Sequence, residues 1–250
     1  MSETESIQIN LNSKFASKYI NGSKSNCSFN IPPINVPSQH HIHISVVNCI
    51  IPYSFYNING SNNLLYYIVN QTPITLLIEP GNYNSTQLTA YLNQKMVSGM
   101  SISYNSIYNK FTFKNINSLE FVLVGFSTLL KVLGFNKELD DFVSVNYELV
   151  SNECSNLNTN QCIHIKSNFL TGNINSINFY MQDTLTTIPI NSPPNSLIIY
   201  NSFVKNMVNL YSRVINEIQI KLVNQDDIIL DLNGLDWSIT LQLDIVDFVN

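Results

Sequence analysis

Charged side chains are scarce in this sequence. Asp, Glu, Lys and Arg make up 12% of its 250 residues, against roughly 25% in an ordinary soluble domain. Asparagine and serine supply the polarity instead, and 44% of the residues are hydrophobic. The formal net charge is -5, so the sequence lacks the basic excess that nucleic-acid binding requires. We therefore do not expect DNA or RNA as the main ligand.

Targeting segments and long apolar runs are also missing. The opening residues, MSETESIQIN, are polar and acidic, whereas a signal peptide has a basic start and an apolar centre. No apolar run approaches the roughly 18 residues that span a bilayer. The four cysteines, Cys27, Cys49, Cys154 and Cys162, are too few and too irregularly spaced for a disulfide framework. We expect a protein made in the cytosol, without a membrane span and with free thiols.

Period-two hydrophobic alternation is the strongest pattern that is present. Such alternation places successive side chains on opposite faces of a β-sheet. It predicts strands in which one face is buried and the other is wet or contacts polar groups. The proposed core residues on these strands are Ile42, Ile44, Val46, Trp237, Ile239, Leu241 and Leu243, with Ile245 closing the last series.

Short strands recur along the rest of the chain, separated by Asn, Gly and Pro turns. We expect them at 7–11, 64–69, 75–78, 101–104, 110–114, 119–124, 143–150, 162–167, 176–182, 197–200, 215–223 and 228–232. Many short strands at near-regular spacing predict an all-β fold, an antiparallel β-sandwich or barrel.

Two helical segments interrupt this rhythm. In GNYNSTQLTAYLNQKM, Asn84 or Ser85 caps a helix with its apolar residues on one face, and in STLLKVLGF a helix begins after Ser127 and ends at Gly134. Hairpin strands lie between them. We treat 81–135 as a helix-plus-hairpin (α/β) insertion in one domain that spans 1–250. A helix lying across one end of a sandwich would give the same pattern.

Candidate catalytic groups have ordinary structural explanations. His41 and His43 share one strand face, but a zinc site needs a third ligand and nothing places His164 near them. Cys162 lies beside His164 in sequence, whereas cysteine catalysis normally uses a distant histidine. Ser127 lacks the second glycine of a nucleophile elbow, and we expect it to cap the helix that follows. We predict no metal site, no cofactor and no enzyme activity.

The acidic residues fall at turns or in a solvated patch. Asp226 and Asp227 fit a hairpin turn, and Asp231 and Asp236 flank the Asn-Gly turn at 233–234. Glu138, Asp140 and Asp141 are typical of a solvated face. What remains is a low-charge β-sandwich rich in Asn, Ser and Tyr. Such a surface suits large permanent contacts, since it buries polar but uncharged area at little desolvation cost.

Four segments, in order, carry a resemblance to a known family. They are VVNCIIPYSFYNINGSNNLLYYIV, IEPGNYNSTQLTAYLNQKM, LLKVLGF and INEIQIKLVNQDDIILDLNGLDWSITLQLDI. Together they resemble the penton or minor capsid proteins of the double-jelly-roll virus lineage. That lineage comprises virophages, Polinton-like viruses, adintoviruses and related large DNA viruses of eukaryotes.

The resemblance implies a single jelly roll that forms a homopentamer at the vertices of an icosahedral virion. Its partners would be further copies of itself and the major capsid protein. Tyr53, Phe55 and Tyr56 would be aromatic anchors, either at a neighbour's surface or plugging the end of the sandwich. Two other functions stay open: a minor capsid or cement protein beneath the facets, favoured by the modest chain length, and a carbohydrate- or receptor-binding β-sandwich.

Overall fold

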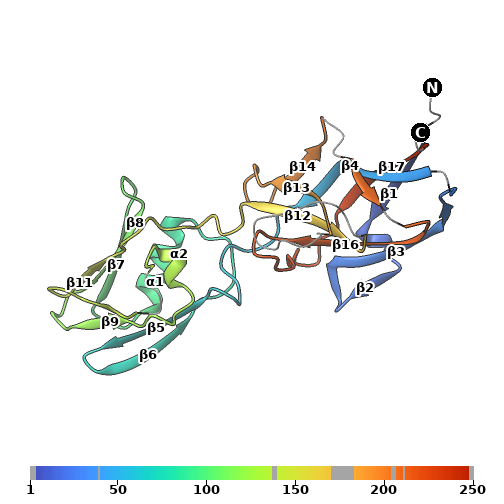
Figure 1. Ribbon diagram of the computed structural model, residues 1–250. Coiled ribbons are helices and arrows are strands. Elements are labelled where there is room, and N and C mark those ends of the chain that lie inside the picture. Colours follow the sequence, from blue (N-terminus) through green and yellow to red (C-terminus); the bar gives the residue numbers. More distant parts are fainter. Residues whose placement is uncertain are drawn as a thin grey trace. The chain divides into compact units, whose positions relative to one another are not determined.

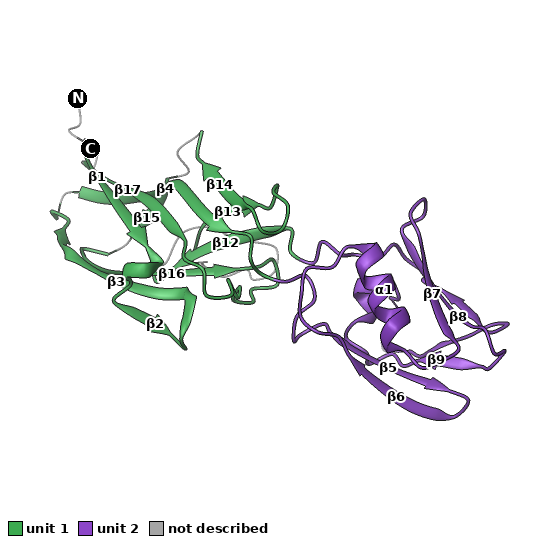
Figure 2. Ribbon diagram, turned by 180° about the vertical axis from the view of Figure 1, so that it is seen from behind, with its two compact units in different colours: residues 1–55, 160–250 green, residues 56–159 purple. Residues whose placement is uncertain are grey.

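The computed structural model describes residues 4–38, 40–136, 140–169, 183–203, 207–210 and 212–247. Figure 1 and Figure 2 show its elements and its two compact units. Unit 1 comprises 1–55 and 160–250, and unit 2 comprises 56–159. Each unit has its own hydrophobic core. The strand expected at 176–182 and Glu138 lie outside the described residues.

Unit 1 consists of two antiparallel sheets. The first has the order β1 (Thr4–Asn12), β17 (Ser238–Asp247), β4 (His40–Pro52) and β14 (Leu197–Asn201), and β15 (Val208–Leu210) also pairs with β4. The second has the order β13 (Thr184–Pro189), β12 (Cys162–Ser167), β16 (Val214–Val223), β3 (Ser23–Asn35) and β2 (Lys18–Ile20). A short 3-10 helix, η1 (Ser13–Phe15), follows β1.

The path of the chain through these sheets is that of a jelly roll. The chain crosses repeatedly between the sheets, from β3 to β4, from β13 to β14 and from β16 to β17. The last strand, β17, lies between β1 and β4 and pairs with both. Two packed antiparallel sheets joined by such crossings are the arrangement of a jelly roll. The predicted all-β sandwich of jelly-roll type is confirmed.

The alternation in β17 and β4 sets the inner face of the first sheet. Leu241 and Leu243 of β17 lie opposite Val46 and Ile44 of β4, and all four are buried. The register shifts between Thr240 and Leu241. The shift leaves one extra residue on β4, a β-bulge. The buried positions of β4 therefore change from the even-numbered Ile44 and Val46 to the odd-numbered Cys49 and Ile51.

All seven proposed core residues are buried in the unit 1 core: Trp237, Ile239, Leu241, Leu243, Ile42, Ile44 and Val46. Trp237 precedes β17 rather than lying within it. Its indole N–H donates to the Lys24 carbonyl at 2.7 Å, and its ring packs edge-on against Phe29 with centroids 6.1 Å apart. The tryptophan therefore joins β17 to β3 of the opposite sheet.

Unit 2 contains two smaller antiparallel sheets and two helices. One sheet has the order β10 (Phe142–Val143), β9 (Phe121–Leu123), β5 (Leu64–Val69) and β6 (Thr72–Leu77). The other has the order β11 (Glu148–Val150), β8 (Lys110–Asn115) and β7 (Met100–Asn105). The expected segment 81–135 lies inside this unit, which extends beyond it on both sides, because the β5–β6 hairpin and strands β10 and β11 complete its sheets.

The helices of unit 2 begin and end at recognisable residues. Helix α1 (Ser85–Lys95) starts with a capping box in which Asn84 and Gln87 bond each other's backbone N–H groups. Helix α2 (Leu130–Leu133) ends at Gly134, whose φ of 84° is left-handed. A side chain there would also meet the Glu153 carbonyl at 2.5 Å. Ser127 does not cap α2, contrary to expectation, since it bonds Tyr66 and Val124 in the turn before the helix.

Helices α1 and α2 have 11 and 4 residues. Within the described part of the chain, no helix has the length and hydrophobicity to cross a membrane.

Candidate functional site

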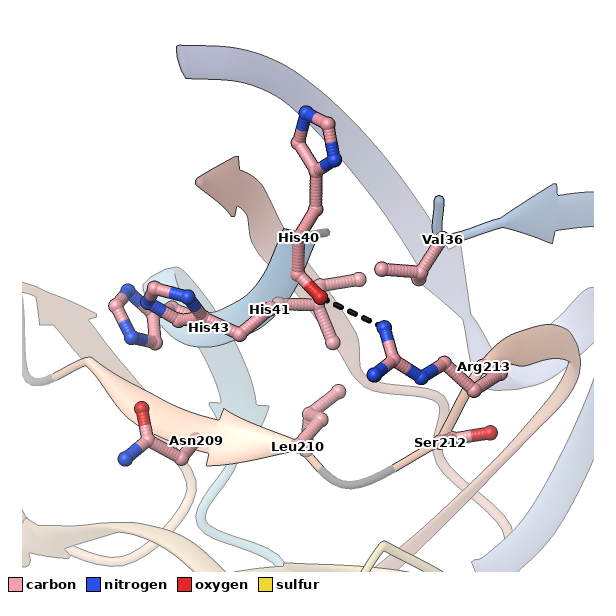
Figure 3. Close-up of a pocket in the computed structure, with 9 residues that line it drawn as sticks. Val36, His40, His41, His43, Asn209, Leu210, Ser212 and Arg213 are labelled. Atoms are coloured by element: carbon pink, nitrogen blue, oxygen red, sulfur yellow. Dashed lines mark hydrogen bonds between the residues drawn. The ribbon is translucent and has the colours of Figure 1, made fainter. Parts of the chain in front are cut away.

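A pocket of about 410 Å³ in unit 1 is lined by residues of β4 and β15 together with Val36, Ser212 and Arg213. Arg213 lies on one side of the pocket and fixes the backbone there, because its Nη1 donates to the carbonyls of Pro37 and His40 at 3.0 and 2.7 Å. Figure 3 shows the His41 and His43 rings on the opposite side from Arg213, while the His40 ring points away. The charged and titratable groups that line the pocket therefore do not converge on one point.

His41 and His43 do share a face of β4, as their spacing predicts. Their ring centroids are 4.6 Å apart. His43 lies opposite Asp244 of β17 and Asn209 of β15. Burial, and then the neighbouring His41, lower the pKa of His43 from its usual 6.5, while Asn209 and Asp244 oppose that shift. The His43 ring is therefore neutral near pH 7.

His164 lies apart from this pair, on β12 in the second sheet. Its Nδ1 is 2.8 Å from the Thr187 hydroxyl, and its Nε2 is 3.7 Å from the Cys162 sulfur. Burial and the nearby Asp226 raise the pKa of Cys162, whereas a nucleophilic cysteine needs a lowered one. The pair makes a thiol–imidazole contact without the charge separation that catalysis would use.

Carboxylates take structural roles in the described residues. Asp236 pairs with Lys24 at 2.8 Å and accepts a hydrogen bond from the Ser13 hydroxyl. Lys24 is the main cause that lowers the pKa of Asp236. Asp227 has a φ of 64° in the turn after β16, and it pairs with Lys166 at 2.6 Å. Across the described residues, no group of three or more His, Cys, Asp or Glu side chains is placed to hold a metal ion.

The three aromatic residues after β4 separate into two environments. Tyr53 and Phe55 are buried in the unit 1 core, with their rings stacked 4.5 Å apart. Tyr53 also exchanges backbone hydrogen bonds with the loop before β14, through Asn195 and Ser196. Tyr56 is the first residue of unit 2 and is 37% exposed. Tyr53 and Phe55 thus belong to the unit 1 core, and Tyr56 alone of the three is exposed.

An exposed apolar patch that was not predicted from the sequence lies on the outer face of the first sheet. We call it the β14 edge: Ile50, Leu197 and Ile199, which are 39%, 55% and 57% exposed. Ile199 lies opposite Ile50 across the β14–β4 pair. The run Leu-Ile-Ile-Tyr was a usable signal, because a strand apolar on both faces is typical of one covered on both sides.

A second exposed apolar patch lies where β1 turns into β2. We call it the η1 edge: Phe15 and Tyr19, which are 75% and 38% exposed, with the exposed Lys14 and Lys18 beside them. Tyr19 donates its hydroxyl to the Ser13 carbonyl at 2.8 Å, and Lys14 Nζ lies 5.8 Å from the Phe15 ring centroid. Both patches offer contact surface rather than reactive groups.

Comparison with known proteins identifies the architecture. No family model and no curated protein matches the sequence. Among solved structures, the crystal structure of the mavirus penton protein matches with a TM-score of 0.52 and 11% identity, and the match covers 96% of this chain and 99% of that one. The expected resemblance is confirmed at the level of the fold. The chain therefore has the fold of a penton protein.

Proposed function

We propose that this protein is a structural component of a virus capsid, and specifically the penton that forms a homopentamer at the vertices. The observation that carries the proposal is the match to the mavirus penton protein over 96% of the chain. That length includes both the jelly roll and unit 2. A likeness confined to the jelly roll would fit many unrelated proteins, since that fold serves many functions.

The chemistry of the surface supports an assembly role over catalysis. His41 contacts His43, His164 contacts Cys162, and Asp236 and Asp227 pair with lysines. The β14 and η1 edges expose the large apolar side chains of Leu197, Ile199 and Phe15. Copies of the chain and the major capsid protein are the partners we propose, within the virion. Unit 2 would then be the second part of the penton, in addition to the jelly roll.

The presence of unit 2 favours the penton over a cement protein beneath the facets. The chain length had favoured a cement protein, because a jelly roll and a second unit must share 250 residues. Residues 56–159 nevertheless build a unit with its own core. The chain thus provides both parts.

Antibody labelling of purified virus particles that contain this chain tests the proposal. Gold-labelled antibodies against unit 2 should mark the five-fold vertices. Labelling spread over the facets would replace the penton with a cement protein. Absence of the chain from particles would overturn a capsid function and favour the receptor-binding sandwich.

A further inference from the structure

We propose that the β14 edge of one copy binds the η1 edge of the next, head to tail. This inference rests on the proposed penton function, and it names the surfaces through which the copies meet. The occupant of each edge is therefore a second copy of this chain.

The topology places the two edges on opposite flanks of unit 1. Strand β1 is one end of the first sheet and β2 is the same-side end of the second, and η1 lies between them in the chain. Strands β14 and β13 are the ends on the other side, linked by the loop 190–196 and by the Tyr200 and Thr186 hydroxyls at 3.4 Å. The strands of unit 1 can be followed in Figure 2. A closed ring of copies requires two different surfaces of this kind.

The β14 edge lacks the protection that an edge strand in water normally has. Natural edge strands carry charged residues, prolines or bulges that block pairing with another chain. From 184 to 201 the sequence has no charged residue, and the prolines at 193 and 194 precede the strand. Its outward residues Leu197 and Ile199 are more than half exposed. Such an edge is suited to being covered.

The η1 edge is suited to cover it. Phe15 presents an aromatic ring from a short segment that is tied down, because the Ser13 N–H donates to the Trp237 carbonyl at 3.0 Å. Aromatic side chains on fixed backbone are common anchors at interfaces. The aliphatic groups of Ile50, Leu197 and Ile199 offer an apolar surface to such a ring.

The lysines at the η1 edge disfavour contact between two η1 edges. Lys14 and Lys18 would face each other if two η1 edges met, and like charges opposed across an interface are unfavourable. The β14 edge would not repel these lysines, because residues 184–201 include no charged side chain. Head-to-tail contact is therefore favoured over contact between two η1 edges.

The test uses two variants, Ile199→Asp for the β14 edge and Phe15→Asp for the η1 edge. Both side chains are exposed, so neither change enters the core. Leu77→Asp, at an exposed apolar position in unit 2, is the matched control. Light scattering and negative-stain class averages give mass and symmetry over a range of concentrations. Fluorescence of Trp237 reports whether unit 1 is folded, and Leu197→Asp replaces Ile199→Asp if that variant fails to fold.

Wild type and Leu77→Asp should form five-fold rings, and each edge variant alone should be monomeric. An equal mixture of the two edge variants should form heterodimers, because one intact β14 edge then meets one intact η1 edge. Rings that survive both edge changes would overturn the interface and leave the penton function standing. Dimers of the Phe15 variant alone would show pairing between β14 edges. A wild-type chain without rings, alone or with the major capsid protein, would overturn interface and function together.

Discussion

Replacing Leu241 by alanine should destabilise unit 1 and leave unit 2 unchanged. Leu241 is fully buried, opposite Ile9 of β1 and Val46 of β4. Truncating a buried leucine costs about 2–5 kcal/mol, from lost transfer free energy and from the cavity that remains. With a urea dependence of about 2 kcal/mol per M, the unfolding midpoint of unit 1 should fall by about 1–2.5 M.

Intrinsic fluorescence measures this effect in unit 1 alone, because Trp237 is the single tryptophan and lies in that core. Leu235→Ala is the exposed control, and its effect should stay within about 0.5 kcal/mol. Leu123→Ala, in the unit 2 core, should shift the circular-dichroism transition and not the fluorescence. An unchanged fluorescence midpoint in Leu241→Ala would refute the described packing of β17. Equal shifts in both signals for both core variants would refute independent cores.

Three further outcomes follow from individual side chains. Iodoacetamide should label the exposed Cys154 first. Cys27 and Cys49 should react only after unfolding, because burial raises the pKa of each thiol to about 12. Early labelling of Cys27, detected by mass spectrometry, would contradict its burial. The lowered pKa of His43 means that the unfolded chain binds more protons as the pH falls through 6.5, so stability should drop below that pH. His43→Asn should flatten the dependence of the urea midpoint on pH, and an unchanged slope would argue against this residue as its source. Asn84→Ala should lower the stability of unit 2 by about 1 kcal/mol, because it removes the helix cap. Asn84→Asp should retain most of that stability. Equal circular-dichroism midpoints for the wild type and both variants would contradict the capping box.

The parts of the fold that the sequence predicted are those with regular local patterns. The alternation of β17 and β4 and the cap at Asn84 each depend on a few neighbouring residues. Strand β3 was missed, because Ser23–Asn35 contains Ser and Asn at buried positions and two adjacent prolines. The prolines fall where the β16–β3 register shifts, so they do not interrupt the ladder.

Other differences arise from turn geometry and tertiary pairing. The single strand expected at 143–150 is broken by a tight turn, because Asn146 and Tyr147 both adopt positive φ, and β10 and β11 on its two sides belong to different sheets. No strand forms at 228–232, where the chain makes only a bridge between Val223 and Ile229. Tyr147 carries no sequence signal for that backbone, since a tyrosine rarely adopts positive φ.

The β14 and η1 edges could not be predicted from the sequence, because their exposure depends on how distant strands pair. Ile198 faces inward and Ile199 outward, and the sequence alone does not say that β14 ends a sheet. The same holds for Phe15, whose exposure depends on η1 crossing from the edge of one sheet to the edge of the other. The histidine pair, by contrast, was correctly placed on one face, and only the three-dimensional structure shows His164 in the other sheet.

The most direct test of the penton assignment is the mass and symmetry of the purified protein. Light scattering combined with negative-stain class averages, with and without the major capsid protein, provides both. A penton should form five-fold rings with five times the mass of the 28.4 kDa chain. A monomer, or a symmetric dimer, under both conditions would contradict it.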